Sequence, residues 1–119
     1  MSSHTPLLPF LAGLKSRRVL VVEDECQKAL DLVQMLTRHG AAVIGPYRSV
    51  EIAMAELRQN RRPDLAILDM DPMADAARDL AKRLKAQAIP IVLVICRDCD
   101  ALPPPFQTTP RLERHVDLW

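Results

Sequence analysis

The acidic residues with the clearest chemical potential follow two apolar runs. Asp69 closes the run Leu65–Leu68, and Glu23 and Asp24 follow the run Val19–Val22. If the two runs form neighbouring parallel strands, the three carboxylates lie at one edge of a sheet, where open α/β sheets bind ligands. Crowded carboxylates repel one another unless a hard cation lies between them, and Mg²⁺ suits oxygen ligands. The pattern therefore predicts a cation-binding acidic pocket.

The segments around these acids alternate between strand and helix patterns. Strands are expected at residues 18–22, 41–44, 65–69, 89–95 and 111–116, with the second strand closed by Gly45-Pro46 and the fourth entered through Pro90. Helices are expected at residues 26–39, 49–60 and 75–87. This alternation is typical of a parallel sheet that is covered by helices on both faces. The sequence predicts a three-layer α/β sandwich.

Each expected helix carries apolar residues at helical spacing, which predicts the face that packs on the sheet. These faces are Cys26, Leu30, Val33 and Leu36 in the first helix, Val50, Ala53, Met54 and Leu57 in the second, and Ala77, Leu80, Ala81 and Leu84 in the third. Ser49 is the expected N-cap of the second helix. Gly40 is expected to end the first helix, with His39 as a structural cap beside it.

Composition limits the class of protein. The chain has 119 residues, of which 49% are apolar, and it carries 16 basic and 15 acidic residues. This length favours one domain, and the balanced charge gives no electrostatic reason to expect a nucleic-acid partner. No apolar run approaches the roughly 20 residues that cross a bilayer. Three cysteines are too few for a disulfide framework, so we expect a reducing cytoplasm.

The first 16 residues differ in composition from the rest of the chain. They are rich in Ser, Pro and Leu, and we interpret residues 1–16 as an extension and residues 17–119 as the domain. The apolar segment Leu7–Leu14 is short and has no basic stretch before it, so we do not expect it to be a signal peptide.

Several motifs together resemble the receiver domain of bacterial two-component response regulators. They are Val21-Val22-Glu23-Asp24-Glu25, Pro63-Asp64-Leu65 before the third strand, and Ile89-Pro90 before the fourth. The Leu102-Pro103-Pro104 stretch resembles the single-domain receivers common in alphaproteobacteria, in which a proline-containing loop replaces the fourth helix. The resemblance covers residues 17–117 and implies a flavodoxin-like, five-stranded parallel sheet in the order 2-1-3-4-5.

This resemblance also implies roles for individual residues. Asp69 would accept a phosphoryl group from a histidine kinase or phosphotransfer protein. Mg²⁺ would be held by Glu23, Asp24 and Asp69, with the backbone carbonyl of Asp71 as a further ligand. The implied protein is not an enzyme in its own right, and it would act by binding a downstream protein.

The chain departs from the receiver pattern at three places. The Thr or Ser that ends strand four in receivers is replaced by Ile95, which has no hydroxyl group. The Lys-Pro pair of strand five is replaced by Arg114-His115, so Arg114 is the candidate phosphate contact. A fifth helix is absent or truncated after Val116. We expect the bare sheet face near Val94 and Leu112 to be covered either by a homodimer or by residues 7–14.

Other functional interpretations remain open. Asp69-Met70-Asp71 matches the nucleophile motif of haloacid-dehalogenase-type phosphatases, but Met73 occupies the position of the usual Thr and no downstream Lys follows Lys85. Cys96-Arg97-Asp98-Cys99, together with Cys26, leaves a redox or metal sensor as an alternative. A third possibility is a binding module of the same fold that works without phosphorylation.

Overall fold

The computed structural model describes residues 12–59, 62–95, 102, 106–107 and 109–113. The strands are β1 (Arg18–Glu23), β2 (Ala42–Tyr47), β3 (Leu65–Asp69), β4 (Ile91–Ile95) and β5 (Arg111–Glu113). The helices are α2 (Cys26–Arg38), α3 (Val50–Gln59) and α4 (Asp75–Ala86). All of the predicted elements are therefore present, and most of their boundaries agree within two residues.

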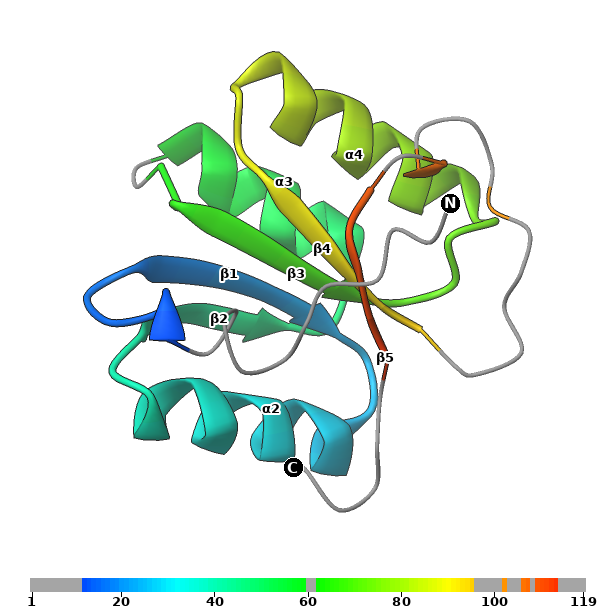
Figure 1. Cartoon of the computed structure of the whole chain (residues 1–119). Coiled ribbons are helices and arrows are strands. Elements are labelled where there is room, and N and C mark those ends of the chain that lie inside the picture. Colours follow the sequence, from blue (N-terminus) through cyan, green and yellow to red (C-terminus); the bar gives the residue numbers. More distant parts are fainter. Residues whose placement is uncertain (1–11, 60–61, 96–101, 103–105, 108, 114–119) are drawn as a thin grey trace.

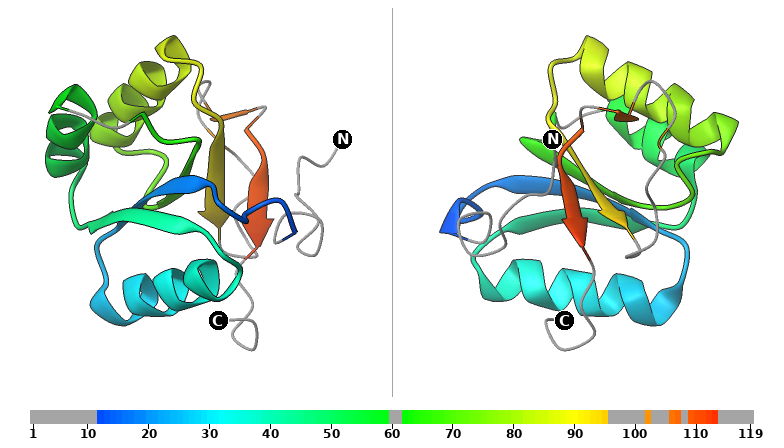
Figure 2. Two further views of the ribbon diagram at one scale, coloured as in Figure 1. Left: turned by 90° about the vertical axis from the view of Figure 1, so that its left-hand side faces the viewer. Right: turned by 45° about the vertical axis from the view of Figure 1, so that its right-hand side comes forward.

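The strands form one parallel sheet in the order β2-β1-β3-β4-β5. Helix α2 covers one face of the sheet, and α3 and α4 cover the other (Figures 1 and 2). The three-layer arrangement and the strand order are those predicted. The carboxyl ends of β1 and β3 lie on the right in Figure 1, and the strands begin on the left.

A separate apolar cluster fills each side of the sheet. The cluster on the α3 and α4 side contains Leu20, Ala66, Leu68, Leu80 and Leu84, and it also includes Leu102 and Phe106. The cluster on the α2 side contains Val19, Val21, Leu32, Leu36 and Ile67. Both faces of β1 and β3 are buried, and the residues between the ends of these central strands are all apolar, as is typical of parallel sheets.

Helix α2 packs through a face that shares only Leu36, among its fully buried residues, with the predicted one. Its buried residues are Ala29, Leu32, Met35 and Leu36, whereas Cys26 is exposed and Leu30 is 50% exposed. The helix has two rows of apolar residues at helical spacing, one with Cys26 and Leu30 and one with Ala29 and Leu32, and spacing alone does not show which row faces the sheet. The buried stripe is the one that meets Val19, Val21 and Ile67 on the sheet. The predicted inner faces of α3 and α4 are confirmed, with Met54 and Leu57 partly buried.

Strand β2 does not end at Gly45-Pro46, as the sequence had suggested, but continues to Tyr47. The β1–β2 register shifts between Leu20 and Val22, and the Gly45–Pro46 peptide bond is cis. Proline is tolerated at this position because β2 is an edge strand. A Cβ at Gly45, where φ is +107°, would lie 2.9 Å from both the Tyr47 nitrogen and the Val21 oxygen. Only glycine fits this irregular pairing.

The last two strands differ in extent from their predictions. Strand β4 begins at Ile91 rather than Ile89, and the Pro90 carbonyl accepts a hydrogen bond from the Ala66 amide at 2.9 Å. Strand β5 is described over Arg111–Glu113, so the predicted part at residues 114–116 lies outside the described residues. The expected absence of a fifth helix also concerns residues 114–119, which lie outside them.

The sheet face at Val94 is covered within the chain, and Leu14, the last residue of the segment predicted as one possible cover, takes part. Val94 is only 5% exposed and belongs to the α2-side cluster, together with Leu14 at 2%. The segment before β1 therefore contributes Leu14 to the core, and the exposed patch that motivated a homodimer is absent at Val94. The side chain of Leu112 lies outside the described part of the chain. A homodimer stays a prediction, as does the domain boundary at residue 16.

Helices α2 and α4 end in the same hydrogen-bonding motif with different residues. In α2 the amides of Gly40 and Ala41 donate to the carbonyls of Thr37 and Leu36, and Gly40 has φ +86°. In α4 the amides of Ala88 and Ile89 donate to the carbonyls of Lys85 and Leu84. These are Schellman motifs, in which the left-handed residue is usually glycine. Ala88 occupies that position with φ +58°, where its Cβ is strained.

We predict that Ala88→Gly stabilises the protein by about 0.5 to 1 kcal/mol, because it removes the steric cost of the left-handed conformation. Urea unfolding followed by circular dichroism measures this difference. Ala86→Gly, two residues earlier in the exposed last turn of α4, is the matched control and should destabilise by about 0.5 to 1 kcal/mol. A loss of stability in both variants would contradict strain at Ala88.

An ion pair joins the start of β1 to the residue before β3. Asp64 Oδ2 accepts a hydrogen bond from the Arg18 amide at 2.8 Å and lies 3.7 Å from Arg18 Nε. The amide hydrogen bond, helped by the guanidinium charges of Arg18 and Arg17, holds the pKa of Asp64 below its ordinary value of 3.8. The charged carboxylate therefore favours the folded state.

This lowered pKa predicts a loss of stability in acid. A carboxyl group with a depressed folded-state pKa stabilises the protein above its unfolded pKa, and that contribution disappears as the pH falls through the folded pKa. Asp64→Asn keeps an acceptor for the Arg18 amide but removes the charge. We expect the Asp64→Asn variant to be less stable than the parent chain at about pH 7, with the difference shrinking towards about pH 3. A difference that is independent of pH in urea unfolding would rule out this linkage.

Candidate functional site

Glu23 and Asp69 are direct neighbours at the carboxyl edge of the sheet. They are the last residues of β1 and β3, and they are partners in the parallel register of these two strands. Neighbouring strands lie about 4.8 Å apart, so the two side chains start from adjacent points on the same edge. Glu23 is only 2% exposed, and Asp69 is partly buried. The structure thus brings together the two predicted carboxylates that end these strands.

Asp24 and Glu25 form the bend between β1 and α2 and take different roles. Asp24 is exposed beside the strand end. Glu25 caps α2, because its carboxylate accepts hydrogen bonds from the amides of Gln27 at 3.2 Å and Lys28 at 2.6 Å. The Glu25 amide in turn donates to Glu23 Oε1 at 3.1 Å. This bend orients the buried Glu23 carboxyl group at the sheet edge.

The capping role of Glu25 was missed in the sequence. Ser, Thr, Asp and Asn are the usual N-cap residues, so a glutamate before a helix gives a weak signal. Its position directly before the first helical residue, Cys26, was the only available indication. By contrast, Ser49 caps α3 as predicted, with its Oγ accepting from the Ile52 amide at 3.3 Å. His39 is the C-cap residue of α2, and its Nδ1 lies 2.9 Å from the Met35 carbonyl oxygen.

Asp71 stabilises the loop between β3 and α4. Its Oδ1 accepts a hydrogen bond from the Met73 amide at 2.9 Å, and its carbonyl oxygen accepts one from the Ala74 amide at 3.2 Å. The carbonyl predicted as a metal ligand is therefore already an acceptor within its own turn. A carbonyl oxygen has two lone pairs, so it retains the capacity to bind a second partner.

The acidic edge carries the oxygen atoms that a magnesium site requires. Its described side chains are not already grouped around a single point. Carboxylate and carbonyl oxygens are the ligands that Mg²⁺ prefers. Within the part of the chain that the structure describes, however, no three His, Cys, Asp or Glu residues are grouped closely enough to hold a metal ion. Glu23 and Asp69 form a close pair, and Asp24 lies at the adjacent exposed bend.

Ile95 and Arg114 are the two positions predicted to be near the phosphoryl group, and the structure describes the side chain of neither. Ile95 is the last residue of β4, at the strand end where receivers carry a hydroxyl group, and its register partner in β5 is Glu113. The described part of the chain includes the backbone of Ile95 but not its side chain, and it does not include Arg114. The phosphate-contact role of Arg114 stays a prediction.

Of the three cysteines behind the redox or metal-sensor alternative, the structure describes only Cys26. Cys26 is an exposed free thiol at the first residue of α2. Cys96 and Cys99 lie outside the described residues, so a grouping of the three thiols stays untested.

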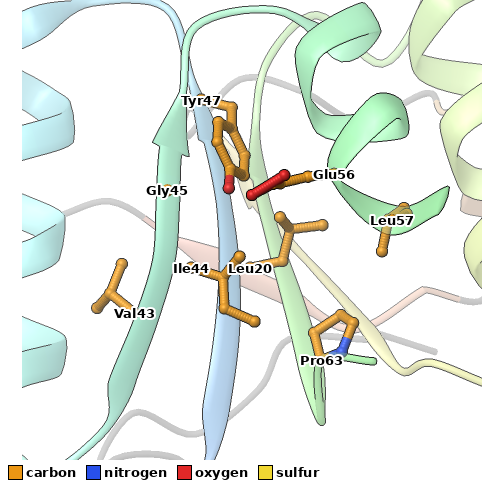
Figure 3. Close-up of a pocket in the computed structure, with 8 residues that line it drawn as sticks. All are labelled: Leu20, Val43, Ile44, Gly45, Tyr47, Glu56, Leu57 and Pro63. Atoms are coloured by element: carbon orange, nitrogen blue, oxygen red, sulfur yellow. The ribbon is translucent and has the colours of Figure 1, made fainter. Parts of the chain in front are cut away.

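A pocket of about 220 Å³ lies between β2 and α3, away from the acidic edge (Figure 3). Most of its lining residues are apolar, but the Tyr47 hydroxyl and the Glu56 carboxyl group also line it: the residues are Leu20, Val43, Ile44, Gly45, Tyr47, Glu56, Leu57 and Pro63. Glu23, Asp24, Asp69 and Asp71 do not line this pocket, so it is separate from the predicted site. No pattern in the sequence indicated it.

Known proteins resemble this chain in sequence and in fold, although no family model matches it. The chain is 32% identical over 79 residues to the transcriptional regulatory protein PdtaR of Mycobacterium tuberculosis. That match covers 66% of this chain but only 38% of the relative. No helix among the described residues is long and apolar enough to span a membrane.

Solved structures of similar fold include two of SdrG. The solution structure of SdrG from Sphingomonas melonis Fr1 is 25% identical, with a TM-score of 0.69 over 99% of this chain and 90% of that chain. Its BeF3-activated conformation, from Pseudomonas melonis Fr1, is 27% identical, with a TM-score of 0.69 over 84% of this chain and 86% of that chain.

A third similar protein is the response regulator TrrA of Thermotoga maritima, solved in complex with Mg²⁺ and BeF. It is 17% identical, with a TM-score of 0.63 over 85% of this chain and 89% of that chain, so this likeness concerns the fold alone. TrrA was also solved in complex with the histidine kinase ThkA, with 19% identity and a TM-score of 0.68 over 85% of this chain and 90% of that chain. Taken with the order of the strands and the paired acids at their ends, these likenesses lead to one conclusion: this chain has the fold of response-regulator receiver domains and is similar to them in sequence.

Proposed function

We propose that this chain is a receiver domain and a cytoplasmic phosphoacceptor in two-component signalling, with Asp69 as the accepting residue. The observation that carries the proposal is the register pairing of Asp69 with the buried Glu23 at the carboxyl edge of the sheet. A second carboxylate beside the acceptor gives this edge the negative charge and the oxygen donors that a divalent cation requires. The donor would be a histidine kinase or phosphotransfer protein, and the output would be binding of another protein.

The proposed step is a phosphoryl transfer to a carboxylate. An oxygen of Asp69 forms a bond to phosphorus while the bond between phosphorus and the donor's histidine nitrogen breaks, and that nitrogen keeps the electron pair. The product is an acyl phosphate on Asp69. Protein groups contribute to such a reaction mainly by positioning and by balancing charge. The end of β3 positions Asp69, because its backbone is held in register by β1.

The residues that would hold Mg²⁺ are Glu23, Asp24 and Asp69, with the Asp71 carbonyl oxygen as a backbone ligand. When bound, Mg²⁺ supplies positive charge that balances the phosphoryl oxygens during transfer. The SdrG structure in a BeF3-activated conformation and the TrrA complex with Mg²⁺ and BeF support this proposal by analogy. The histidine kinase ThkA bound to TrrA supports the proposed class of donor.

The same fold also suits a binding module that works without phosphorylation. Ile95 at the end of β4 favours this second candidate, because its side chain has no hydroxyl group to hold a phosphoryl oxygen. A modification shifts an equilibrium between two conformations only through interactions that differ between them. With Ile95 and Arg114 in place of the usual pair, phosphorylation would have little conformational effect. The two candidates therefore differ in whether Asp69 is phosphorylated.

We predict that Mg²⁺ stabilises the fold through the acidic edge. Ligand binding to the folded state should raise the unfolding free energy by about 1 kcal/mol when Mg²⁺ exceeds its Kd severalfold. Glu23→Gln keeps an oxygen that accepts from the Glu25 amide but removes one charge, so it should abolish most of this effect. Thermal unfolding in MgCl₂ and in NaCl of equal ionic strength measures it.

Asp79→Asn is the matched control for the magnesium experiment, because Asp79 is an exposed acid on α4 beyond its first turn. Its response to Mg²⁺ should equal that of the parent chain. An equal response in Glu23→Gln would contradict magnesium binding at this edge.

We predict that beryllofluoride, a phosphoryl mimic, causes only local changes in amide NMR spectra of the parent chain in the presence of Mg²⁺. Shifts should appear near Asp69 but not across β4, because Ile95 offers the mimic no hydrogen bond. Ile95→Thr restores a hydroxyl group at this position and should extend the shifts along β4, whereas Ile95→Val should not. Extended shifts in the parent chain would disprove the weak-switch interpretation.

Phosphorylation itself is tested with acetyl phosphate and intact-mass spectrometry. The parent chain should gain the mass of one phosphoryl group, and Asp69→Asn should not. A parent chain that gains none, although it binds Mg²⁺, would favour the phosphorylation-independent module.

A further inference from the structure

Acidic side chains predominate at the carboxyl edge of the sheet, where Lys28 and Arg48 are also found, and basic side chains predominate at the amino edge, although the chain has a formal net charge of only +1. The carboxyl edge holds the acids that end strands or begin helices: Glu23, Asp24, Glu25, Glu51, Asp69, Asp71 and Asp75. The amino edge holds the basic residues that end helices or precede strands: Lys15, Arg17, Arg18, Arg38, Arg58, Arg62, Arg83 and Lys85. All of these basic residues are exposed except Arg83, which is partly exposed.

Hydrogen bonds connect the segments that carry these basic residues. The Ala42 amide donates to the Arg17 carbonyl, and the Asp64 amide donates to the Arg18 carbonyl, each at 2.8 Å. The Arg62 guanidinium donates to the carbonyls of Gln87 and Ala88 at 2.9 and 3.0 Å. The starts of β1, β2 and β3 and the end of α4 therefore lie side by side, on the left in Figure 1.

Helix dipoles explain only part of this basic edge. Arg38, Arg58, Arg83 and Lys85 lie in the last turns of their helices, where cations interact favourably with the negative end of the dipole. Lys15, Arg17 and Arg18 lie in the segment that leads into β1, not in the last turn of α2, α3 or α4, so the dipoles of these three helices do not account for them. Two described acids lie among these basic residues: Asp64, whose charge is balanced by Arg18, and Glu56 near the end of α3.

An apolar hollow opens among these residues. It has a volume of about 410 Å³ and lies between the segment before β1 and the starts of β3 and β4. Leu14, Leu65, Pro90 and Val92 supply its apolar surface, and Gly13, Arg17 and Asp64 complete its lining. A hollow of this size accommodates a large apolar side chain, while the cations around it attract negative charge.

We propose that the amino edge binds an acidic segment of a partner protein, with one apolar side chain of that segment in the hollow beside Leu14. Charge complementarity selects acidic residues, and the hollow supplies the apolar anchor that protein interfaces usually contain. This inference extends the proposed function, since it gives the downstream protein its own side of the molecule. The acidic edge at Asp69 stays free for the phosphoryl donor while the partner is bound.

Two other polyanions fit this edge less well. Single-stranded nucleic acid is usually held by aromatic stacking as well as by charge. Of the two aromatic residues in the described part of the chain, Phe106 is buried and Tyr47 lies at the carboxyl end of β2. A membrane-binding surface usually combines exposed apolar side chains with basic ones. Among the described residues, the exposed large apolar side chains belong to Leu30, Ile52 and Met73, which follow the carboxyl ends of their preceding strands instead.

The proposal is tested with a short fluorescein-labelled peptide of aspartate and glutamate residues that has one central leucine. Fluorescence anisotropy with the unphosphorylated protein should show saturable binding that weakens with salt. The double variant Arg17→Glu/Arg38→Glu should bind at least about tenfold more weakly, because it reverses two charges on the edge. Replacing the leucine of the peptide by serine should weaken binding about fivefold or more, since a buried apolar side chain is lost.

The matched control is Lys28→Glu/Arg48→Glu, which makes the same change in charge near the carboxyl edge. Its affinity should equal that of the parent chain, and circular dichroism confirms that each variant is folded. Equal binding by both double variants, or indifference to the leucine, would overturn the proposal. Tighter binding of oligodeoxythymidylate or of phosphatidylserine vesicles than of the peptide would assign the edge to nucleic acid or membrane instead. Because Asp69 is unmodified throughout, failure here is distinct from failure to accept a phosphoryl group.

Discussion

The parallel pairing of β1 with β3 is the constraint on which the functional edge depends. Its register places Val19 opposite Leu65 at one end and Glu23 opposite Asp69 at the other. A slip of one residue would exchange the two faces of the strand, so that each of its side chains would have to pack in the cluster on the opposite side of the sheet. Burial of Val21 and Ile67 on one face and of Leu20 and Leu68 on the other resists that slip. Apolar burial at the centre of the sheet therefore keeps two like charges adjacent at its edge.

The two faces of this sheet are closed partly by residues outside the helices. On the α2 side, Leu14 from the segment before β1 joins the cluster that contains Val94. On the opposite side, Leu102 and the fully buried Phe106 join the cluster packed by α3 and α4. Complete burial of one such side chain contributes about 2 to 3 kcal/mol. Residues outside the three helices α2, α3 and α4 thus supply part of the apolar cover of the sheet.

The chain connectivity of a parallel α/β fold also separates acidic from basic side chains. Every helix begins near the carboxyl edge of the sheet and ends near the amino edge, so acids at helix starts and bases at helix ends collect at opposite sides. In this chain Glu25 caps α2 at the acidic edge, and Arg62 binds the last carbonyls beyond α4 at the basic edge. The chemistry of a cation and a phosphoryl group is thereby confined to one edge. The other edge offers cations to a different partner.

Local patterns in the sequence determined the elements and the position of the acids. The apolar runs ending in Glu23 and Asp69 identified the central strands, and helical spacing identified the buried faces of α3 and α4. These predictions succeeded because each depends on one segment and its immediate neighbours. The receiver resemblance added the strand order, which local patterns alone do not specify.

Only the tertiary structure decided which surfaces meet. It selected Ala29 and Leu32 rather than Cys26 and Leu30 as the inner face of α2, since both stripes have helical spacing and only one faces the sheet. In the tertiary structure β2 continues past Gly45-Pro46 to Tyr47, because an edge strand tolerates a residue without an amide hydrogen. The tertiary structure buried Val94 with Leu14, and it gathered the basic residues of four separate segments at one edge. Composition averages charge over the whole chain, whereas the fold sets where each charge lies, and this is why a nearly neutral sequence forms a molecule with one acidic and one basic edge.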